Sequence, residues 1–285
     1  MRKGFHLSIA GGVRRAAEQA LALGLDCLQI FAGNPRGWSQ KPLDQEDVRR
    51  FKELCRRGGL DPVVVHAPYL INLASHKEEL WQRSLRALAG QLVRARELGA
   101  VAVVVHPGSR GGRSAEWGRE RVCQAVAAAL REAGGGVQCW LENTAGGGGN
   151  LGGPLGELAD MLRRLEDGPA AGAVGACLDT AHAWGAGYDL HSAGAAGRFL
   201  DQVEMELGLW RVKLWHFNDT SVELGSRRDV HCHLGRGRIG GQGFRGLACD
   251  PRLAQAACIM ETPKDSPWAD RRNLAFLRRL ERDCA

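Results

Sequence analysis

Histidines and carboxylates recur in this chain at the ends of short apolar runs. Val63–Val65 is followed directly by His66, and Val101–Val105 is followed directly by His106. Later runs end in, or come shortly before, a further set of such residues: Glu142, Asp179, His182, His216, Asp229, His231 and Glu261. Imidazole and carboxylate groups are common ligands of divalent metals in proteins. The repeat predicts that successive strands carry metal ligands to one shared site.

The size of this set indicates more than one metal ion. A catalytic zinc usually takes three protein ligands and keeps one position open. Nine ligands, with one carboxylate shared between two ions, therefore suit three divalent metals. Histidine and carboxylate without cysteine favour zinc or manganese over magnesium. Each residue alone has an ordinary alternative, a core histidine or a salt-bridge carboxylate, so the prediction depends on the whole set.

Eight strand-like runs alternate with helix-like stretches along the chain. The runs are continuous and apolar, as in parallel strands that are covered on both faces. They lie at residues 5–9, 27–31, 63–66, 101–106, 137–142, 176–179, 212–216 and 256–261. Stretches with apolar residues at helical spacing lie at 13–23, 45–57, 78–98, 119–132, 155–165, 195–207 and 268–280, with a weaker one at 243–248.

This alternation predicts an α/β protein with a single (β/α)8 TIM barrel. Residues 1–285 are long enough for one such catalytic domain, and no linker divides them. The metal site would then lie at the C-terminal rim of the barrel, where the strand ends meet. An open, doubly wound sheet is the alternative that the pattern leaves open. The glycine-rich stretch 146–153 lacks the Lys-Ser/Thr of a phosphate-binding loop and is interpreted as a flexible rim loop.

The composition of the chain bears on three predictions: its cellular location, the charge of its partners and the state of its cysteines. An apolar content of 44% and a charged content of 25% are ordinary for a globular protein. The N-terminus has no secretory h-region, and no apolar stretch reaches the ~18 residues of a membrane span, so we expect a cytoplasmic protein. The net charge of +6 is compatible with a polyanionic partner but does not require one. Nine cysteines without a C-x-x-C pair are expected to be reduced and mostly buried.

The candidate ligands lie within motifs that resemble those of the endonuclease IV family. The resemblance runs in order along nearly the whole chain, which makes it specific. The motifs are His6-Leu-Ser-Ile-Ala-Gly-Gly12, His66-Ala-Pro-Tyr-Leu-Ile-Asn72, His106-Pro-Gly, Leu141-Glu-Asn-Thr-Ala-Gly146, Cys177-Leu-Asp-Thr-Ala-His182, His216-Phe-Asn-Asp-Thr220, Asp229-Val-His231 and Met260-Glu-Thr-Pro263.

The resemblance implies a barrel with three divalent metals, usually zinc, with manganese possible at one position. By position in the motifs it implies three ligand groups, the first two sharing Glu142: His66, His106 and Glu142; Glu142, Asp179, His216 and Glu261; and His182, Asp229 and His231. His233 follows His231 by two residues and could compete with it, but the motif favours His231. His6 is expected beside the ligands or on the rim, and His76 and His191 on the surface.

The implied activity is that of a phosphoric-diester hydrolase in DNA base excision repair, an apurinic/apyrimidinic-site endonuclease of the deoxyribonuclease IV type. It would cut the phosphodiester 5′ to an abasic site and leave a 3′-hydroxyl and a 5′-deoxyribose phosphate. Two neighbouring metals can share and acidify a water, which gives a bridging hydroxide nucleophile at neutral pH. Glu142, as the bridging ligand, and Glu261, which would orient the hydroxide, are the predicted catalytic residues.

Double-stranded DNA that contains abasic sites is the implied partner, and a monomer is the simplest expectation. The resemblance implies that Arg36, Tyr69 and Leu70 enter the duplex at the lesion, where an aromatic or apolar wedge fills the gap left by the base. The alternative for Tyr69 is a rim aromatic that caps the barrel. Four arginines flank the predicted third metal and are either phosphate contacts or a solvated basic loop: Arg227, Arg228, Arg236 and Arg238.

Two other functions remain open at this point. A xylose-isomerase-like sugar isomerase or epimerase shares the barrel and uses a Glu-Asp-His-Glu metal set. That set is also present here, as Glu142, Asp179, His216 and Glu261. Such an enzyme has no need of the additional histidines, whereas a trinuclear phosphodiesterase does. A non-catalytic nucleic-acid-binding protein fits the charge, but it does not explain a cluster of this kind.

Overall fold

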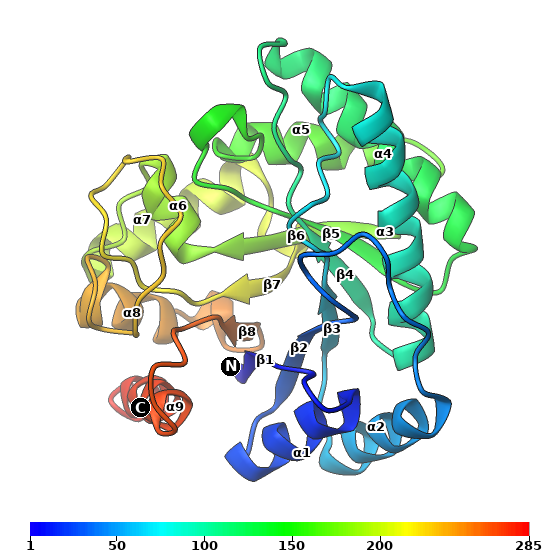
Figure 1. Cartoon of the computed structure of the whole chain (residues 1–285). Helices are drawn as coiled ribbons and strands as arrows, with labels where there is room; N and C mark the ends of the chain where they lie inside the picture. The colour runs from blue at the N-terminus through cyan, green and yellow to red at the C-terminus, as the bar shows by residue number, and fades with distance from the viewer. Residues whose placement is uncertain (285) are drawn as a thin grey trace.

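Eight parallel strands close into one barrel in the order of the sequence, β1 to β8, with β8 pairing with β1 (Figure 1). The computed structural model describes residues 1–284. The strands are β1 (Arg2–Leu7), β2 (Cys27–Phe31), β3 (Val63–His66), β4 (Ala102–Val105), β5 (Gln138–Glu142), β6 (Val174–Asp179), β7 (Val212–His216) and β8 (Ala257–Met260). The predicted closed barrel is therefore confirmed, and the open sheet is excluded.

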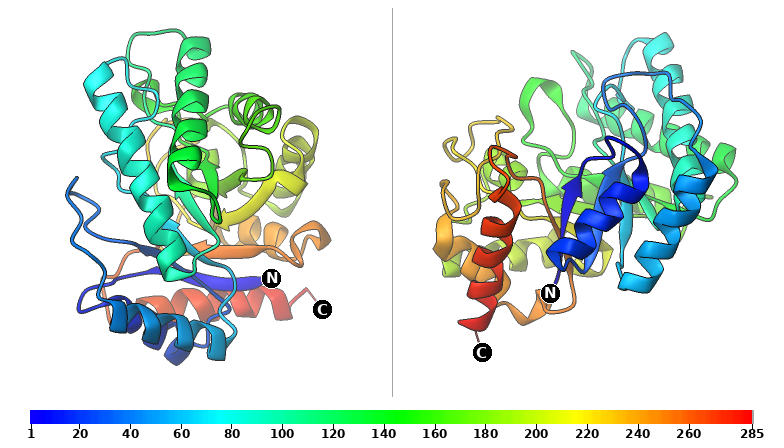
Figure 2. Two further views of the ribbon diagram at one scale, coloured as in Figure 1. Left: turned by 90° about the vertical axis from the view of Figure 1, so that its right-hand side faces the viewer. Right: turned by 60° about the horizontal axis from the view of Figure 1, so that its bottom comes forward.

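Helices surround the barrel and connect successive strands (Figures 1 and 2). They are α1 (Val13–Leu23), α2 (Gln45–Gly58), α3 (Glu78–Leu98), α4 (Ala115–Ala133), α5 (Leu155–Glu166), α6 (Thr180–Ala186), α7 (Ala193–Glu206), α8 (Gly240–Ala248) and α9 (Ala269–Arg282). Three 3₁₀ turns are η1 (Gly147–Gly149), η2 (Leu209–Arg211) and η3 (Pro251–Leu253). The sequence did not predict the short α6, which has no amphipathic period because all but its last residue are buried.

The core has two layers that the barrel wall separates. One cluster fills the space between strands and helices and includes Phe5, Leu88 and Trp215. The other lies inside the barrel and consists of small and branched residues with one tryptophan: Cys27, Val64, Ala102, Val104, Trp140, Cys177, Leu214, Ala257 and Ile259. Because side chains alternate across each strand, both faces must be apolar, which explains the continuous apolar runs. This filled interior supports the polar rim from below.

One expectation about the cysteines is wrong. Seven cysteines are free, as expected, but Cys249 and Cys284 form a disulfide. Cys249 follows the last residue of α8, and Cys284 lies two residues beyond α9, so the bond joins the ends of two neighbouring helices. Their separation of 35 residues gives no local signal, and only the packing of α8 against α9 brings the two sulfurs together. Across residues 1–284, none of the helices has the length and apolar character that membrane crossing requires.

Candidate metal centre

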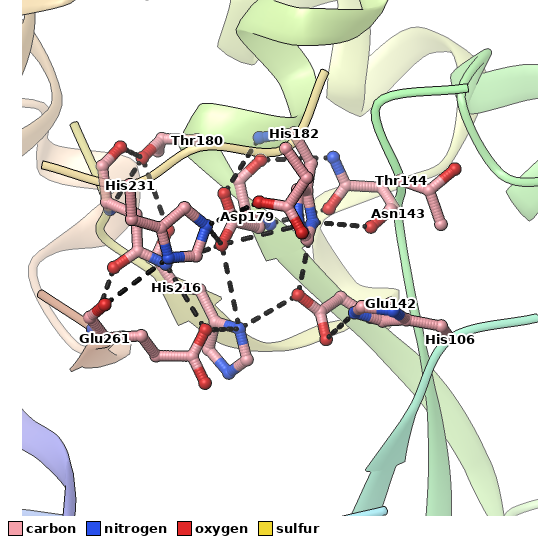
Figure 3. A network of polar contacts seen from close by, with 12 residues as sticks. His106, Glu142, Asn143, Thr144, Asp179, Thr180, His182, His216, His231 and Glu261 are labelled. Carbon is pink, nitrogen blue, oxygen red and sulfur yellow. Dashed lines mark hydrogen bonds and ion pairs between the residues drawn. The ribbon is translucent and has the colours of Figure 1, made fainter. Parts of the chain in front are cut away.

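The predicted ligands gather at the C-terminal rim because they occupy equivalent ends of parallel strands. His66, Glu142, Asp179 and His216 are the last residues of β3, β5, β6 and β7. Asp179 pairs directly with His216 across neighbouring strands, and Glu142 pairs with Cys177, two residues before Asp179. Loops that leave the same rim carry the remaining residues of the set. Figure 3 shows most of this cluster as one network of polar contacts.

Glu142 lies at the centre of the cluster and is fully buried. Its Oε2 atom lies 3.1 Å from Nε2 of His66 and 3.0 Å from Nε2 of His106. Its Oε1 atom faces the other way, 3.0 Å from Nδ1 of His216 and 3.3 Å from Nδ1 of His182. The two oxygens of one carboxylate thus face two different groups of imidazoles, the geometry that a bridging ligand requires.

His216 and three carboxylates form a second group beside the first. Nδ1 of His216 lies 3.4 Å from Oε2 of Glu261 and 3.9 Å from Oδ2 of Asp179, in addition to its contact with Glu142. One ligand atom from each of these four residues can be chosen so that all lie within 4.8 Å of one another. The same holds for His66, His106 and Glu142. These two groups could each hold a metal ion.

The third group lies beside the short helix α6, whose N-terminus is capped by Asp179 of the second group. Oδ1 of Asp179 accepts a hydrogen bond from the backbone N–H of His182 at 2.9 Å, which caps the N-terminus of α6. Nε2 of His182 lies 3.2 Å from Oδ2 of Asp229, and Nε2 of His231 lies 3.2 Å from Oδ1 of the same carboxylate. Asp179, His182 and His231 also meet the 4.8 Å criterion. The structure therefore brings all nine predicted residues together.

Hydrogen bonds orient three imidazoles of the cluster, those of His66, His182 and His231. One nitrogen of the ring donates to a backbone carbonyl: Nδ1 of His66 to Ala67 at 2.8 Å, and Nδ1 of His182 to Asn143 at 2.9 Å. His231 makes a longer contact of the same kind, 3.3 Å to the carbonyl of Glu261. In each ring the other nitrogen is left facing the carboxylates. This arrangement fixes both tautomer and ring orientation, as in metal sites.

Three buried amides that the sequence analysis did not assign also position the ligands. Asn143 accepts from the backbone N–H of Asp179 at 2.6 Å, and Asn218 accepts from that of Glu261 at 2.8 Å. Gln29, inside β2, contacts His216 and Glu261 through opposite ends of its amide. Asn143 and Asn218 belong to the motifs quoted above. Gln29 had one signal, a polar residue within an otherwise apolar strand.

The electrostatics of the cluster reflect buried carboxylates that face several imidazoles. Burial alone would raise the pKa of Glu142, but His216 and His106 hold it well below its usual range. Burial opposes a charge on His182, yet Asp179 and its neighbours raise the pKa of that histidine well above its usual value. No lysine or arginine contacts Glu142 within the described residues. The cluster therefore needs positive charge, from protons on histidine or from bound cations.

The predicted DNA-contact residues lie on loops around this rim. Tyr69 follows β3, is 64% exposed, and rests edge-on against Phe31 with ring centres 5.5 Å apart. It lines both cavities beside the cluster, one of about 260 Å³ and one of about 440 Å³. Leu70 is half-buried, and Arg36 is exposed on the loop after β2. All three lie near the rim. Within residues 1–284, no hydrogen bond joins any two of them.

The remaining histidines lie where the sequence predicts them, either beside the cluster or on the surface. Nδ1 of His6 lies 3.2 Å from Oε1 of Glu261, so it is next to the cluster, while His76 and His191 are exposed. His233 points away from the cluster, with Nε2 3.0 Å from Asp265. Of the four flanking arginines, Arg238 pairs with Glu223. The other three are exposed: Arg227, Arg228 and Arg236.

Known proteins with this fold identify the family. The family model for xylose isomerase-like TIM barrels matches residues 17–280. A probable endonuclease 4 of Chloroflexus aurantiacus is 42% identical over 281 residues, which cover 98% of each chain. This chain belongs to the endonuclease IV family. The solved endonuclease IV of Thermus thermophilus is also 42% identical, has a TM-score of 0.88, and is covered over its full length by 99% of this chain.

Sugar epimerases share the architecture of endonuclease IV more distantly. A D-tagatose 3-epimerase-like protein is 20% identical with a TM-score of 0.69, so the likeness extends to the fold alone. A probable endonuclease 4 of Methanoculleus marisnigri, by contrast, is 42% identical over 279 residues. The endonuclease IV resemblance drawn from the sequence motifs is thus confirmed at the level of the family.

Proposed function

We propose that this chain hydrolyses the phosphodiester 5′ to abasic sites in double-stranded DNA, leaving a 3′-hydroxyl and a 5′-deoxyribose phosphate. One observation carries the proposal: nine histidines and carboxylates, eight in compact groups and Asp229 in contact with His182 and His231, converge on one rim of a barrel that belongs to the endonuclease IV family. The names of its relatives, probable endonuclease 4 and endonuclease IV, agree with this activity. Those names state neither the abasic substrate nor the cleavage products.

The residues of the cluster are arranged to bind divalent metals rather than to form ion pairs with one another. Nε2 of His231 is buried and forms no hydrogen bond, although Asp179 and Asp229 each bring an oxygen within 3.5 Å of it. An imidazole that only paired with a carboxylate would turn to make that bond linear. The Nε2 atom instead faces oxygens of two different carboxylates, those of Asp179 and Asp229. Such convergence, without lysine or arginine on Glu142, supports cations as the missing positive charge.

We propose three divalent ions, most suitably zinc, with manganese possible at one position. Each of the three groups described above would hold one, with Glu142 shared between the first two. Imidazole and carboxylate donors without thiolate match these metals. When bound, such ions activate a water for attack at neutral pH and neutralise charge on the phosphate.

The chain's own residues supply orientation around that chemistry. Both oxygens of Glu142 are engaged, so it serves as a fixed bridge rather than as a mobile base. Glu261 is less buried, and its Oε1 atom is held by the Gln29 amide at 2.7 Å and by His6 at 3.2 Å. Its Oε2 atom faces His216. This geometry supports a role for Glu261 in orienting the attacking water, as the sequence predicts.

DNA would approach from the rim where Tyr69 is exposed. A tyrosine beside two cavities that flank the cluster is placed to occupy the gap left by a missing base. An abasic nucleotide has already lost its stacking, so displacing it towards the cluster costs less free energy than displacing an intact nucleotide. Leu70 and Arg36 lie on neighbouring loops and would contact the same region of the duplex.

Cleavage of a duplex oligonucleotide with one tetrahydrofuran abasic analogue tests the proposal. The analogue cannot undergo β-elimination, so only hydrolysis can cut the strand. The metal content of the same protein sample is counted by mass spectrometry. A nick 5′ to the analogue with about three metals per chain supports the proposal. No nick from fully metallated protein would overturn it and would direct attention to sugar substrates.

A further inference from the structure

A groove separate from the two cavities beside the metal cluster runs along the flank of the barrel. It encloses about 760 Å³ between the loop that follows β7 and one face of α9. Its lining residues are His233, Leu234, Arg236, Asp265, Arg272, Asn273, Ala275, Phe276, Arg279 and Arg282. Figure 2 (right) shows α9, in red, beside the gold-coloured loop segment that contributes the other wall.

Hydrogen bonds and packing hold the floor of the groove in place. Asn273 is buried on α9; its amide nitrogen donates to Nδ1 of His233 at 3.0 Å, and its oxygen accepts from the backbone N–H of Leu234 at 3.0 Å. Gly235 packs so closely on the ring of Phe276 that a Cβ atom there would lie 2.6 Å from ring carbons. Loop and helix therefore form one rigid surface.

The groove carries excess positive charge. Asp265 is its one lining carboxylate, and it already contacts His233 at 3.0 Å and Arg272 at 3.6 Å. Among residues 1–284, Arg236, Arg279 and Arg282 form no ion pair with a carboxylate, and all three are exposed. By contrast, many arginines elsewhere on this surface are paired, such as Arg252 with Asp250. Unpaired guanidinium groups in a groove favour a ligand with several phosphates.

The spacing of these arginines suits a nucleic-acid backbone. Residues 272, 279 and 282 share one face of α9, and ten residues of helix span about 15 Å. A strand of B-form DNA covers that length with roughly four to five nucleotides at about 3.4 Å each. The groove begins beside the rim, at the N-terminal end of α9. Its lining residue there, His233, follows His231 of the metal cluster by two residues. The groove follows α9 from there towards Arg279 and Arg282, beside the start of β1, where Glu281 pairs with Lys3. DNA that bends over the edge of the rim would therefore enter the groove.

We propose that this groove binds the sugar–phosphate backbone of DNA that flanks the cleavage site. The inference rests on the proposed endonuclease function for the identity of the polyanion. It extends the DNA contacts from the rim loops to the side of the barrel, with Arg279 and Arg282 as phosphate ligands.

Charge reversal at two positions tests the proposal. Arg279→Glu with Arg282→Glu removes the two positive charges in the last turn of α9. The matched control is Arg131→Glu with Arg163→Glu, two exposed arginines in the last turns of α4 and α5. Both double variants change the net charge equally, and both place carboxylates in the last turns of helices. The probe is undamaged duplex DNA of about 30 base pairs, whose binding is measured by fluorescence anisotropy across a range of salt concentrations.

The groove variant should bind at least tenfold more weakly than the control variant. Its salt dependence should be flatter by roughly 2 in log–log slope, because each lost phosphate contact contributes about 0.9. Equal losses in the two variants would show a general charge effect and would overturn the proposal. Circular dichroism checks folding, and Arg279→Ala with Arg282→Ala repeats the test without new carboxylates.

Cleavage by the unmodified protein separates this inference from the proposed function. Suppose that the unmodified protein cuts the abasic analogue and both double variants bind undamaged duplex equally well. The groove proposal is then refuted, and the proposed endonuclease function is supported. If the unmodified protein neither binds nor cuts DNA, both fail. Weaker binding confined to the groove variant, together with cleavage by the unmodified protein, supports the groove; without cleavage, the proposal that the groove binds DNA beside a cleavage site is overturned.

Discussion

The side-chain oxygen of Gln29 lies 2.9 Å from Nε2 of His216, on the side of the ring opposite Glu142. Nδ1 of the same ring lies 3.0 Å from Oε1 of Glu142. Because the Gln29 oxygen can only accept, Nε2 carries a proton, which leaves Nδ1 as the nitrogen that would bind a metal in the cluster. The amide nitrogen of Gln29 donates to Glu261 at 2.7 Å. One buried glutamine thus sets the orientation of two proposed ligands.

Replacing this glutamine should weaken metal binding. In Gln29→Leu, His216 and Glu261 lose their fixed partner, and metal affinity should fall about 10–100-fold. Competition with a chromophoric chelator measures the affinity directly. The control is Gln91→Leu in α3, a similarly buried glutamine whose oxygen has no hydrogen-bond partner. Unchanged affinity in Gln29→Leu would contradict the positioning role.

Glu142→Gln should remove cleavage almost completely. The amide is neutral and offers one oxygen in place of two, so it cannot bridge two groups of imidazoles. We expect the rate on abasic duplex to fall on the order of 10³-fold or more, with fewer metals bound per chain. Glu261→Gln is the comparison, because it should lower the rate and keep more of the metal. Full rate with full metal content in Glu261→Gln would refute the orienting role of that residue.

Tyr69→Ala should impair DNA engagement and leave the cluster intact. Loss of a stacking aromatic costs about 1–3 kcal/mol, so the affinity for abasic duplex should fall about 5–150-fold. Metal content and thermal stability should not change, since the ring is 64% exposed. Trp210→Ala is the matched control, because this tryptophan is 63% exposed and precedes β7 at the opposite rim. Equal effects of the two substitutions would argue against Tyr69 as the wedge.

Metal removal should make stability depend on pH. In the protein without metal, burial opposes the charge on His231, but Asp179 and Asp229 raise its pKa to about 9. Histidine in an unfolded chain has a pKa of about 6.5. The stabilising contribution of this charge is therefore complete below about pH 6.5 and is lost as the pH rises to about 9. Denaturant melts of chelator-treated protein between these values should show falling stability.

Metal-loaded protein provides the control for this pH series. Bound metal requires neutral imidazoles, so loading should release protons and remove most of the pH dependence in that window. Calorimetric titration with Zn²⁺ in buffers of different ionisation enthalpy counts the protons. If stability without metal stays constant or increases from pH 6.5 to 9, the histidines are not charged as described.

Reduction of the Cys249–Cys284 disulfide should destabilise the protein. The bond closes a segment of 35 residues, and restricting a loop of that size in the unfolded chain stabilises the fold by about 3–4 kcal/mol. Cys284→Ser should show the same loss under oxidising conditions. Cys123→Ser, at a half-buried free thiol, serves as the control. Identical denaturation midpoints for oxidised protein and Cys284→Ser would contradict this prediction.

Much of the architecture could be predicted because parallel barrels have a strong one-dimensional pattern. Each strand is apolar on both faces, so runs such as Val63–Val65 mark strands without an alternating period. Charged amphipathic helices separate them. The helix α6 could not be predicted, because nearly all of its residues are buried and it has no amphipathic period. The disulfide could not be predicted, because its two cysteines meet only through the packing of α8 on α9.

The sequence by itself determined the barrel, the family and the nine residues at the strand ends and rim loops. Ligand chemistry follows from residue type, and their common rim follows from strand direction. Only the tertiary structure decided which nitrogen of each imidazole faces the carboxylates and that Gln29 orients His216. It also decided that His233 turns away into the arginine-lined groove. Those outcomes depend on contacts between residues far apart in the chain, and spacing along a sequence does not encode the direction in which a side chain points.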